Sequence, residues 1–183
     1  VNDSPFAGRE GKYVTSRNIK ERLERELIHN VALRVEPGDS PDKFKVSGRG
    51  ELHLSVLIEN MRREGFELGV SRPEVIQKEI DGKMHEPFEQ LVIDCEEQHQ
   101  GAVMEELGLR RAELENMVPD GKGRIRLEFM VPARGLIGFR SMFLTMTSGS
   151  GIMTHVFDHY GPVKHAEIAG RANGVLVSMV KGK

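Results

Sequence analysis

The strongest constraint on the fold of this chain is an order of predicted elements that occurs twice. Its 183 residues are enough for one or two domains of ordinary size. In each half, a helix is followed by two strands joined by a turn, then by a second helix and a further strand. The second half also begins with a strand, which makes its order βαββαβ. That order is typical of the ferredoxin-like fold, in which two helices cover one face of a four-stranded antiparallel sheet.

The predicted elements follow from apolar spacing, which is helical in some segments and alternating in others. In the first half we expect a helix over 16–30, strands over 31–35 and 43–46, a helix over 51–64, and strands over 66–70 and 75–80. In the second half we expect a strand over 88–95, a helix over 101–111, strands over 114–118 and 124–131, a helix over 136–146, and a strand over 152–157. A polar run at 81–84 is expected to join domains of residues 1–80 and 85–163. We therefore predict an α+β protein with two tandem ferredoxin-like domains, helices on one face of each antiparallel sheet.

Both ends of the sequence lack features of a complete chain. It begins at Val1, with no basic segment followed by an apolar one, which argues against a signal peptide. Only Val1 and Asn2 remain of a leading strand for the first half. The final run, 173–183, has the pattern of a strand without a partner, and a lone strand is marginally stable. We interpret the sequence as a segment of a longer protein; a mature start after processing is the alternative.

Composition limits the classes of protein to which the chain can belong. Apolar residues make up 38%, and there are also 20 glycines, a proportion typical of globular domains. No apolar stretch approaches the roughly 18 residues of a membrane span, so we expect no membrane partner. The single cysteine, Cys95, excludes an internal disulfide framework and a cysteine-based zinc site, and its place in the alternation predicts a core residue. One cysteine and 30% charged residues favour a reducing, cytoplasmic location.

The sequence has no strong motif for catalysis or metal binding. Residues 8–12 (GREGK) resemble a phosphate-binding loop, but no glycine stands five positions before Gly11, as that motif requires, so we interpret them as a basic, mobile turn. His155 and His159 are four residues apart on an expected strand, too far apart to share a metal, and no third ligand is nearby. The remaining candidates are typical of packing or solvated positions: His53, and the group Glu96, Glu97 and His99. We predict no catalytic residue, cofactor site or metal site in this chain.

Basic residues give a better indication of function. The net charge is only −2 at pH 7, so contact with nucleic acid depends on local patches. Lys122, Arg124 and Arg126 recur every second residue with little acid nearby, which on a strand places all three on one face suited to phosphates. An arginine beside glycine precedes the second helix of each half, Arg49 and then Arg134, where helix N-terminal amides can bind an anion. A solvated charged face and an ordinary tight turn are the alternatives for these two patterns.

Several runs resemble the translational GTPases related to elongation factor G. SGRGELHL at 47–54, followed by RPEV at 72–75, is similar to a motif of their domain III. The second half resembles their domain V, through EP at 86–87, PDG at 119–121 and FDHY at 157–160. Four runs narrow the resemblance to one branch of the family: NDSPF at 2–6, EEQHQG at 96–101, RGLIGFR at 134–140 and TMTSG at 145–149. One departure is Ala112, where the family usually has glycine; it puts in doubt only a positive φ there.

The resemblance implies a segment of a bacterial ribosome-associated GTPase that acts in ribosome assembly and stress adaptation. Residues 1–80 and 85–163 then correspond to domains III and V, which contact ribosomal RNA and ribosomal protein, and 164–183 to the start of a C-terminal domain. GTP and Mg²⁺ are expected in a nucleotide-binding domain ahead of Val1, and this chain is expected to be a non-catalytic, monomeric, cytoplasmic part. The residues expected to face RNA are Arg49, Lys122, Arg124, Arg126, Arg134 and Arg140. Arg140 has an alternative role, pairing with an acidic neighbour of its own domain.

Two other classes of function stay open at this point. One is a stand-alone enzyme that uses His53 or the pair His155 and His159, which catalytic turnover by this chain would support. The other is a ligand-binding or oligomerising module, since tandem ferredoxin-like domains often serve in that way. A compact dimer with a buried sheet edge and no ribosome affinity would favour the module.

We predict that this chain alone neither binds nor hydrolyses GTP. The reason is that it has no phosphate-binding loop with its lysine. Isothermal titration of GTP into the chain should give no heat of binding. Micromolar affinity in that titration would contradict the prediction.

Overall fold

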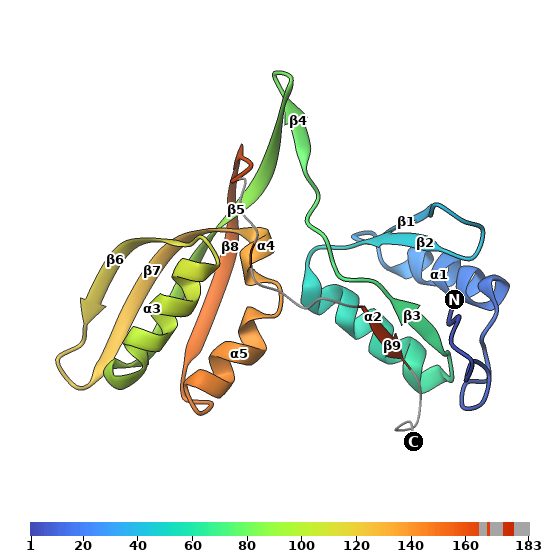
Figure 1. Ribbon diagram of the computed structural model, residues 1–183, viewed down its shortest axis with the longest axis horizontal. Coiled ribbons are helices and arrows are strands. Elements are labelled where there is room, and N and C mark those ends of the chain that lie inside the picture. Colours follow the sequence, from blue (N-terminus) through green and yellow to red (C-terminus); the bar gives the residue numbers. More distant parts are fainter. Residues whose placement is uncertain (165–167, 169–173, 178–183) are drawn as a thin grey trace. The chain divides into compact units, whose positions relative to one another are not determined.

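The computed structural model describes residues 1–164, 168 and 174–177, and these form two compact units (Figure 1). The first unit runs from Val1 to Arg72 and includes the described residues 174–177. The second unit begins at Pro73 and contains the described residues up to 168. Both units contain helices and strands, which confirms the predicted α+β class.

The second unit contains the complete βαββαβ order expected for its half of the chain. Its elements are β5 (Lys83–Glu96), α3 (Gln100–Leu109), β6 (Glu113–Pro119), β7 (Arg124–Pro132), α5 (Phe139–Met146) and β8 (Ile152–Pro162). The strands lie in the order β8–β5–β7–β6, and every neighbouring pair is antiparallel, as in the ferredoxin-like fold. Three short elements are added to this frame: β4 (Lys78–Ile80) paired with β5, η1 (Glu97–His99) before α3, and α4 (Ala133–Leu136) before α5.

Helices α3 and α5 cover one face of this sheet (Figure 1). Alternation along the strands decides which side chains lie under the helices. The strand residues of this core are Leu91, Ile93 and Cys95 from β5, Ile125, Leu127, Phe129 and Val131 from β7, and Met153 from β8. Phe139 and Phe143 of α5 are fully buried against them. Cys95 is a core residue as predicted, and burial raises the pKa of its thiol.

A buried arginine fixes the turn between β7 and α5. Arg110, which follows α3, is 5% exposed, and its Nη1 donates to the carbonyl oxygens of Gly135 (2.8 Å) and Ile137 (3.0 Å). Position 135 has to be glycine, because a Cβ there would lie 2.6 Å from the Arg110 carbonyl oxygen. The next residue, Arg111, turns outward with a φ of 65°. The left-handed conformation therefore falls on Arg111 and not on Ala112.

The first unit has the helix–hairpin–helix–strand order expected of it. Its elements are α1 (Ser16–His29), β1 (Arg34–Pro37), β2 (Phe44–Ser47), α2 (Glu51–Glu64) and β3 (Leu68–Val70). Thr15 caps the start of α1 with its side chain, and Gly65 ends α2 in the left-handed conformation. The largely buried Arg22 guanidinium joins the two helices by binding the carboxylates of Glu64 (2.7 Å) and Glu26 (2.9 Å). Hydrogen bonds to Glu64 and then Glu26 raise the pKa of Arg22 despite its burial.

The strands of the first unit form two separate pairs within the described residues. β1 pairs with β2 as a hairpin, and β3 pairs with β9 (Val175–Val177). The expectation that the final strand has no partner is therefore wrong, since Val70 lies opposite Val175. Val1 and Asn2, expected to be the remainder of a leading strand, lie outside any strand. The full four-stranded order is thus described for the second unit, and the ferredoxin-like fold of the first half stays a prediction.

The predicted domain boundaries need correction. The run 81–84 is not a joint, because Asp81 and Gly82, both with positive φ, form the tight turn between β4 and β5. A polar hairpin turn and a polar linker have the same composition, so sequence pattern does not separate them. The two units divide instead between Arg72 and Pro73. Most of the run 164–183, assigned to the start of a C-terminal domain, lies outside the described residues.

A buried carboxylate holds the N-terminal loop of the first unit. Glu67 is 3% exposed and accepts hydrogen bonds from the Asn2 side chain and from the amides of Gly8 (3.1 Å) and Gly11 (2.9 Å). Burial alone raises the pKa of Glu67, but the hydrogen bonds outweigh it, so this pKa lies below the ordinary 4.5. Gly11 packs so closely that a Cβ would lie 2.3 Å from Glu67 Cβ. The run 8–12, interpreted from the sequence as a mobile turn, is therefore fixed at two amides.

We predict that Glu67→Gln lowers the free energy of unfolding of the first unit by about 2 kcal/mol, the usual scale for buried hydrogen bonds to a charged group. A glutamine presents an NH₂ group to donors that need an acceptor. Urea titration followed by circular dichroism measures the change. The variant Glu24→Gln is the control, because Glu24 is exposed and pairs loosely with Lys20 at 3.7 Å.

The difference between the wild type and Glu67→Gln should also depend on pH. Because the folded-state pKa of Glu67 is depressed, its stabilisation is complete above 4.5 and is lost as the pH falls through the lower folded value. We expect urea titrations from neutral pH to below pH 4.5 to show this. The free energies of unfolding of the wild type and of Glu67→Gln should become equal at the acid end. A difference that stays constant across this range would show that Glu67 is not held ionised.

Candidate nucleic-acid interface

The six residues expected to face RNA lie in three places. Arg49 belongs to the first unit, in the turn before α2. The other five belong to the second unit and are divided between the two ends of β7: Lys122, Arg124 and Arg126 near its start, Arg134 and Arg140 beyond its end. Within the second unit, the structure therefore does not bring the five into one surface.

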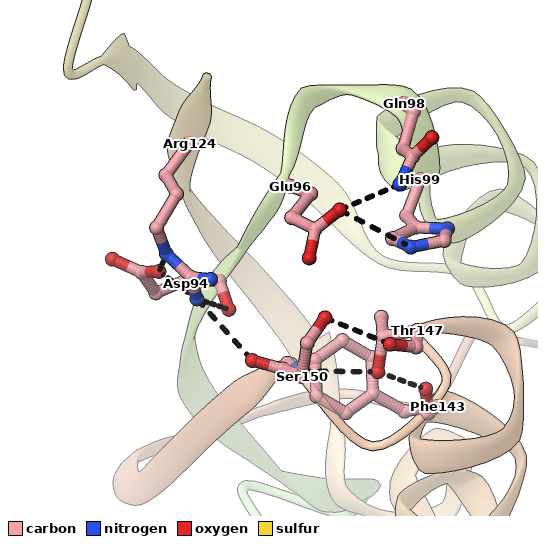
Figure 2. Close-up of polar contacts among 9 residues, drawn as sticks. Asp94, Glu96, Gln98, His99, Arg124, Phe143, Thr147 and Ser150 are labelled. Atoms are coloured by element: carbon pink, nitrogen blue, oxygen red, sulfur yellow. Dashed lines mark hydrogen bonds and ion pairs between the residues drawn. The ribbon is translucent and has the colours of Figure 1, made fainter. Parts of the chain in front are cut away.

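At the start of β7, three segments of the second unit come together, residues 94–99, 119–124 and 147–151, which we call the loop end (Figure 2). The Glu97 amide donates to the Gly123 carbonyl oxygen at 3.0 Å. The Arg124 guanidinium donates to the Ser150 carbonyl oxygen at 3.3 Å. This meeting follows from the fold, because β5 and α5 finish at the end of the sheet where β7 begins.

Arg124 is bound within the loop end. Its guanidinium contacts Asp94 Oδ1 through Nε (2.6 Å) and Nη2 (2.5 Å), and Nη2 also donates to the carbonyl oxygens of Asp94 and Ser150. Figure 2 shows the guanidinium directed at Asp94, with a further contact to Ser150. Arg124 thus joins β5, β7 and the segment before β8, and only 34% of its side chain is exposed.

Of the three cations predicted to share one face of a strand, only Arg124 and Arg126 lie on β7. Lys122 lies in the turn before β7 and not on the strand, which begins at Arg124. Arg126 pairs with Glu128 at 3.0 Å while remaining 57% exposed. The expectation of little compensating acid is therefore wrong, because Asp94 and Glu128 lie beside the two strand cations. Lys122 is exposed and forms no ion pair with the residues that the structure describes.

Several backbone amides at the loop end already donate hydrogen bonds within the second unit. Asp120 Oδ1 accepts the amides of Lys122 (2.7 Å) and Arg124 (3.0 Å), and these hydrogen bonds lower the pKa of Asp120. In the adjoining loop, the amides of residues 150 and 151 both donate to Thr147. These four amides are therefore not available to a partner.

The acidic group at the loop end has the character of a solvated strand end, as the sequence indicated. Glu96 Oε2 accepts a hydrogen bond from Gln98 Nε2 at 2.5 Å and lies 4.0 Å from His99 Nε2 (Figure 2). Beneath it, the buried Thr147 hydroxyl donates to the Phe143 carbonyl oxygen at 2.8 Å. Each of these contacts lies within one stretch of chain, 96–99 or 143–147.

At the far end of β7, one predicted arginine is held internally and the other is exposed. Arg134 Nε donates to Glu86 Oε2 at 2.6 Å, and Glu86, which is fully buried, also accepts the Lys164 amide at 2.9 Å. Arg140, in the first turn of α5, is exposed and forms no ion pair in the described part of the chain. The alternative in which Arg140 pairs with an acidic neighbour is thus not seen among these residues. Arg111, exposed at the same end, was not distinguished from the buried Arg110 by the sequence.

In the first unit, His53 positions the turn that carries Arg49. The Arg49 amide donates to His53 Nδ1 at 3.2 Å, and Asn30, at the end of α1, contacts His53 Nε2 at 2.9 Å. A Cβ at Gly48 would lie 2.7 Å from His53 Nδ1, so glycine permits this packing. The Arg49 side chain is exposed, without an ion pair to any described residue. His53 is therefore a packing residue, and the Arg49 amide is not available to an anion.

The two histidines considered as metal ligands each pair with their own carboxylate. His155 Nδ1 lies 2.5 Å from Glu89 Oε2, and His159 Nδ1 lies 2.6 Å from Asp158 Oδ2. No group of three or more metal-ligating side chains occurs among the described residues. Of the helices described, none has both the length and the apolar character needed to cross a membrane.

Comparison with known proteins relates the whole chain to one group. A family model described as elongation factor G C-terminus matches residues 83–169. The chain is 67% identical over all 183 residues to the large ribosomal subunit assembly factor BipA of Haemophilus influenzae. The identity is 63% to the BipA of Escherichia coli K12 and 60% to that of Bacillus subtilis, again over the entire chain. The chain spans 30% of the length of these curated relatives.

We predict that Arg124→Ala destabilises the second unit by about 1 kcal/mol, the scale for a partly exposed ion pair with accompanying hydrogen bonds. Lys122→Ala, two residues away, should change stability by no more than about 0.5 kcal/mol, because its side chain is solvated. Thermal melting of both variants under the same buffer measures the difference. Equal melting temperatures would show that Arg124 does not hold the loop end together.

Proposed function

We propose that this chain belongs to the family of the BipA proteins and is the ribosome-binding middle segment of a translational GTPase, with residues 83–169 forming an elongation factor G C-terminus domain. The observation that carries the proposal is the 60–67% identity over the whole chain to proteins named large ribosomal subunit assembly factor BipA. Its activity is then assembly of the large ribosomal subunit, with a role in stress adaptation. GTP and Mg²⁺ would bind a nucleotide-binding domain outside this chain.

The exposed cations support contact with ribosomal RNA. Four residues of the expected set have largely solvated side chains: Arg49, Lys122, Arg126 and Arg140. Three of these form no ion pair within the described part of the chain, and Arg126 has a single exposed pair with Glu128. Exposed pairs are weak, so Arg126 can exchange Glu128 for a phosphate at small cost. Arg124 and Arg134 would act by positioning the segments that carry these cations.

The net charge of −2 favours a protein with local contacts over one that coats nucleic acid. Phosphate contacts from a few arginines and lysines would fix the orientation of each unit on the ribosome. Ribosomal protein is the expected second partner, and the segment would act as a monomer in the cytoplasm. A stable dimer without ribosome affinity would instead support the ligand-binding or oligomerising module.

We predict that Lys122→Ala combined with Arg126→Ala weakens co-sedimentation with large ribosomal subunits and flattens its salt dependence. Each lost phosphate contact lowers the slope of log affinity against log salt by about 0.7–0.9. Arg124 is left unchanged so that the loop end keeps its structure. Binding is measured across a series of KCl concentrations, with thermal melting as the check on folding.

The matched control is Arg17→Ala combined with Lys20→Ala, which removes the same charge from α1. Arg17 and Lys20 already pair with Glu21 (2.8 Å) and Glu24 (3.7 Å) along that helix. The control should keep the wild-type salt slope. If the test variant and the control bind alike at every salt concentration, Lys122 and Arg126 do not contact RNA.

A further inference from the structure

The N-terminal loop of the first unit, residues 3–12, presents an aromatic ring and cations on a fixed frame. Glu67 accepts hydrogen bonds from the amides of Gly8 and Gly11 and from the Asn2 side chain. These bonds join the start of the loop to its end. The arm at Lys12 is also tied down, because the Lys12 amide donates to the Gly65 carbonyl oxygen at 2.8 Å. The loop is therefore shaped before any partner binds.

The tip of this loop has an unusual composition for a protein surface. Phe6 is 62% exposed, in a chain where aromatic residues make up only 5%. The Arg9 guanidinium carbon lies 4.8 Å from the centroid of the Phe6 ring, a cation–π geometry. The Arg9 amide donates to the Phe6 carbonyl oxygen at 3.3 Å, which closes the turn between them. Ring and guanidinium are thus held side by side in solvent.

The cations of the loop are available to a phosphate. Arg9 and Lys12 are exposed, and neither forms an ion pair with the residues that the structure describes. Lys12 Nζ lies 5.4 Å from the centroid of the Tyr13 ring. Two aromatic rings with a cation over each therefore lie within eight residues of one another, at Phe6 and at Tyr13.

We propose that Phe6 and Arg9 form a stacking site for an unpaired base of RNA, with Arg9 and Lys12 contacting the adjacent phosphates. The proposal rests on the proposed function, and it adds a second contact with RNA, at the N-terminal loop of the first unit. Proteins bind single-stranded RNA by stacking splayed bases on aromatic rings and on guanidinium planes. A protein partner would take up the exposed ring equally well, but it would not by itself require two cations without acidic partners. The loop also carries two exposed carboxylates, Asp3 and Glu10, so it is the guanidinium held over the exposed ring, more than the net charge, that favours RNA.

The most direct test places a photocrosslinker at position 6, as Phe6→p-benzoylphenylalanine, in the full chain bound to large ribosomal subunits. We expect ultraviolet light to join the chain to ribosomal RNA, giving a product that ribonuclease digestion shortens. A product sensitive only to protease would assign the site to a ribosomal protein and overturn the proposal. Absence of a crosslink at a concentration where the chain co-sediments would overturn it as well.

Substitutions separate stacking from general apolar contact. Phe6→Leu keeps an apolar side chain but removes the ring, and it should raise the Kd for large subunits by about fivefold or more, the scale of one base stack. Phe6→Trp keeps a ring and should bind as the wild type does. Arg9→Gln, which removes the cation, should weaken binding and reduce its salt dependence. Wild-type affinity of Phe6→Leu would exclude stacking.

A matched control lies in the other unit, where Phe157 is 58% exposed. Phe157→Leu should leave the crosslink at position 6 unchanged, since it alters a ring outside the loop. Failure of the wild-type chain to co-sediment with large subunits would refute the proposed function itself. Normal co-sedimentation with no effect of the Phe6 and Arg9 changes would refute only the stacking site.

Discussion

Internal ion pairs of arginine are the interactions on which both units depend. Arg22 joins α1 to α2 through Glu64, and Arg134 joins α4 to the fully buried Glu86 of β5. Removing one partner of such a pair leaves an uncompensated buried charge, which is strongly destabilising. The same pairs decide which cations remain for a partner, because a guanidinium saturated by carboxylates and carbonyl oxygens has no donor left for a phosphate.

The fold of the second unit could be predicted because its pattern is local. Alternation along β7 identifies Ile125 and Leu127 as core residues, and the order of elements then fixes a sheet with helices on one face. The roles of the basic residues could not be predicted in that way. Asp94 lies 30 residues before Arg124, and Glu86 lies 48 residues before Arg134, so only the register of the sheet brings each pair together.

The N-terminal loop also could not be predicted from local sequence, because the residue that fixes it is distant in the chain. From composition, residues 8–12 have the appearance of a mobile basic turn, because glycine and charge are typical of such segments. Their rigidity comes from Glu67, which is 56 residues from Gly11 and follows α2. A single carboxylate, placed by the end of a helix, thus turns a flexible sequence into a fixed surface. The short pairing of β3 with β9 was missed for a related reason, since its partners lie far apart in the sequence.

These contacts also bear on how a nearly neutral chain would bind a highly charged ribosome, as the proposed function requires. With a net charge of −2, long-range attraction is weak and is screened within about 10 Å at ordinary salt. Affinity must then come from a few exposed cations acting at short range and from contacts that do not depend on salt. Stacking on an aromatic ring is a contact of that second kind. The structure supplies both, since Lys122 is exposed at the loop end and Phe6 is exposed on a fixed loop. Because the cations held in internal pairs stabilise the units and the exposed ones remain for the partner, changes to the two groups should affect stability and binding separately.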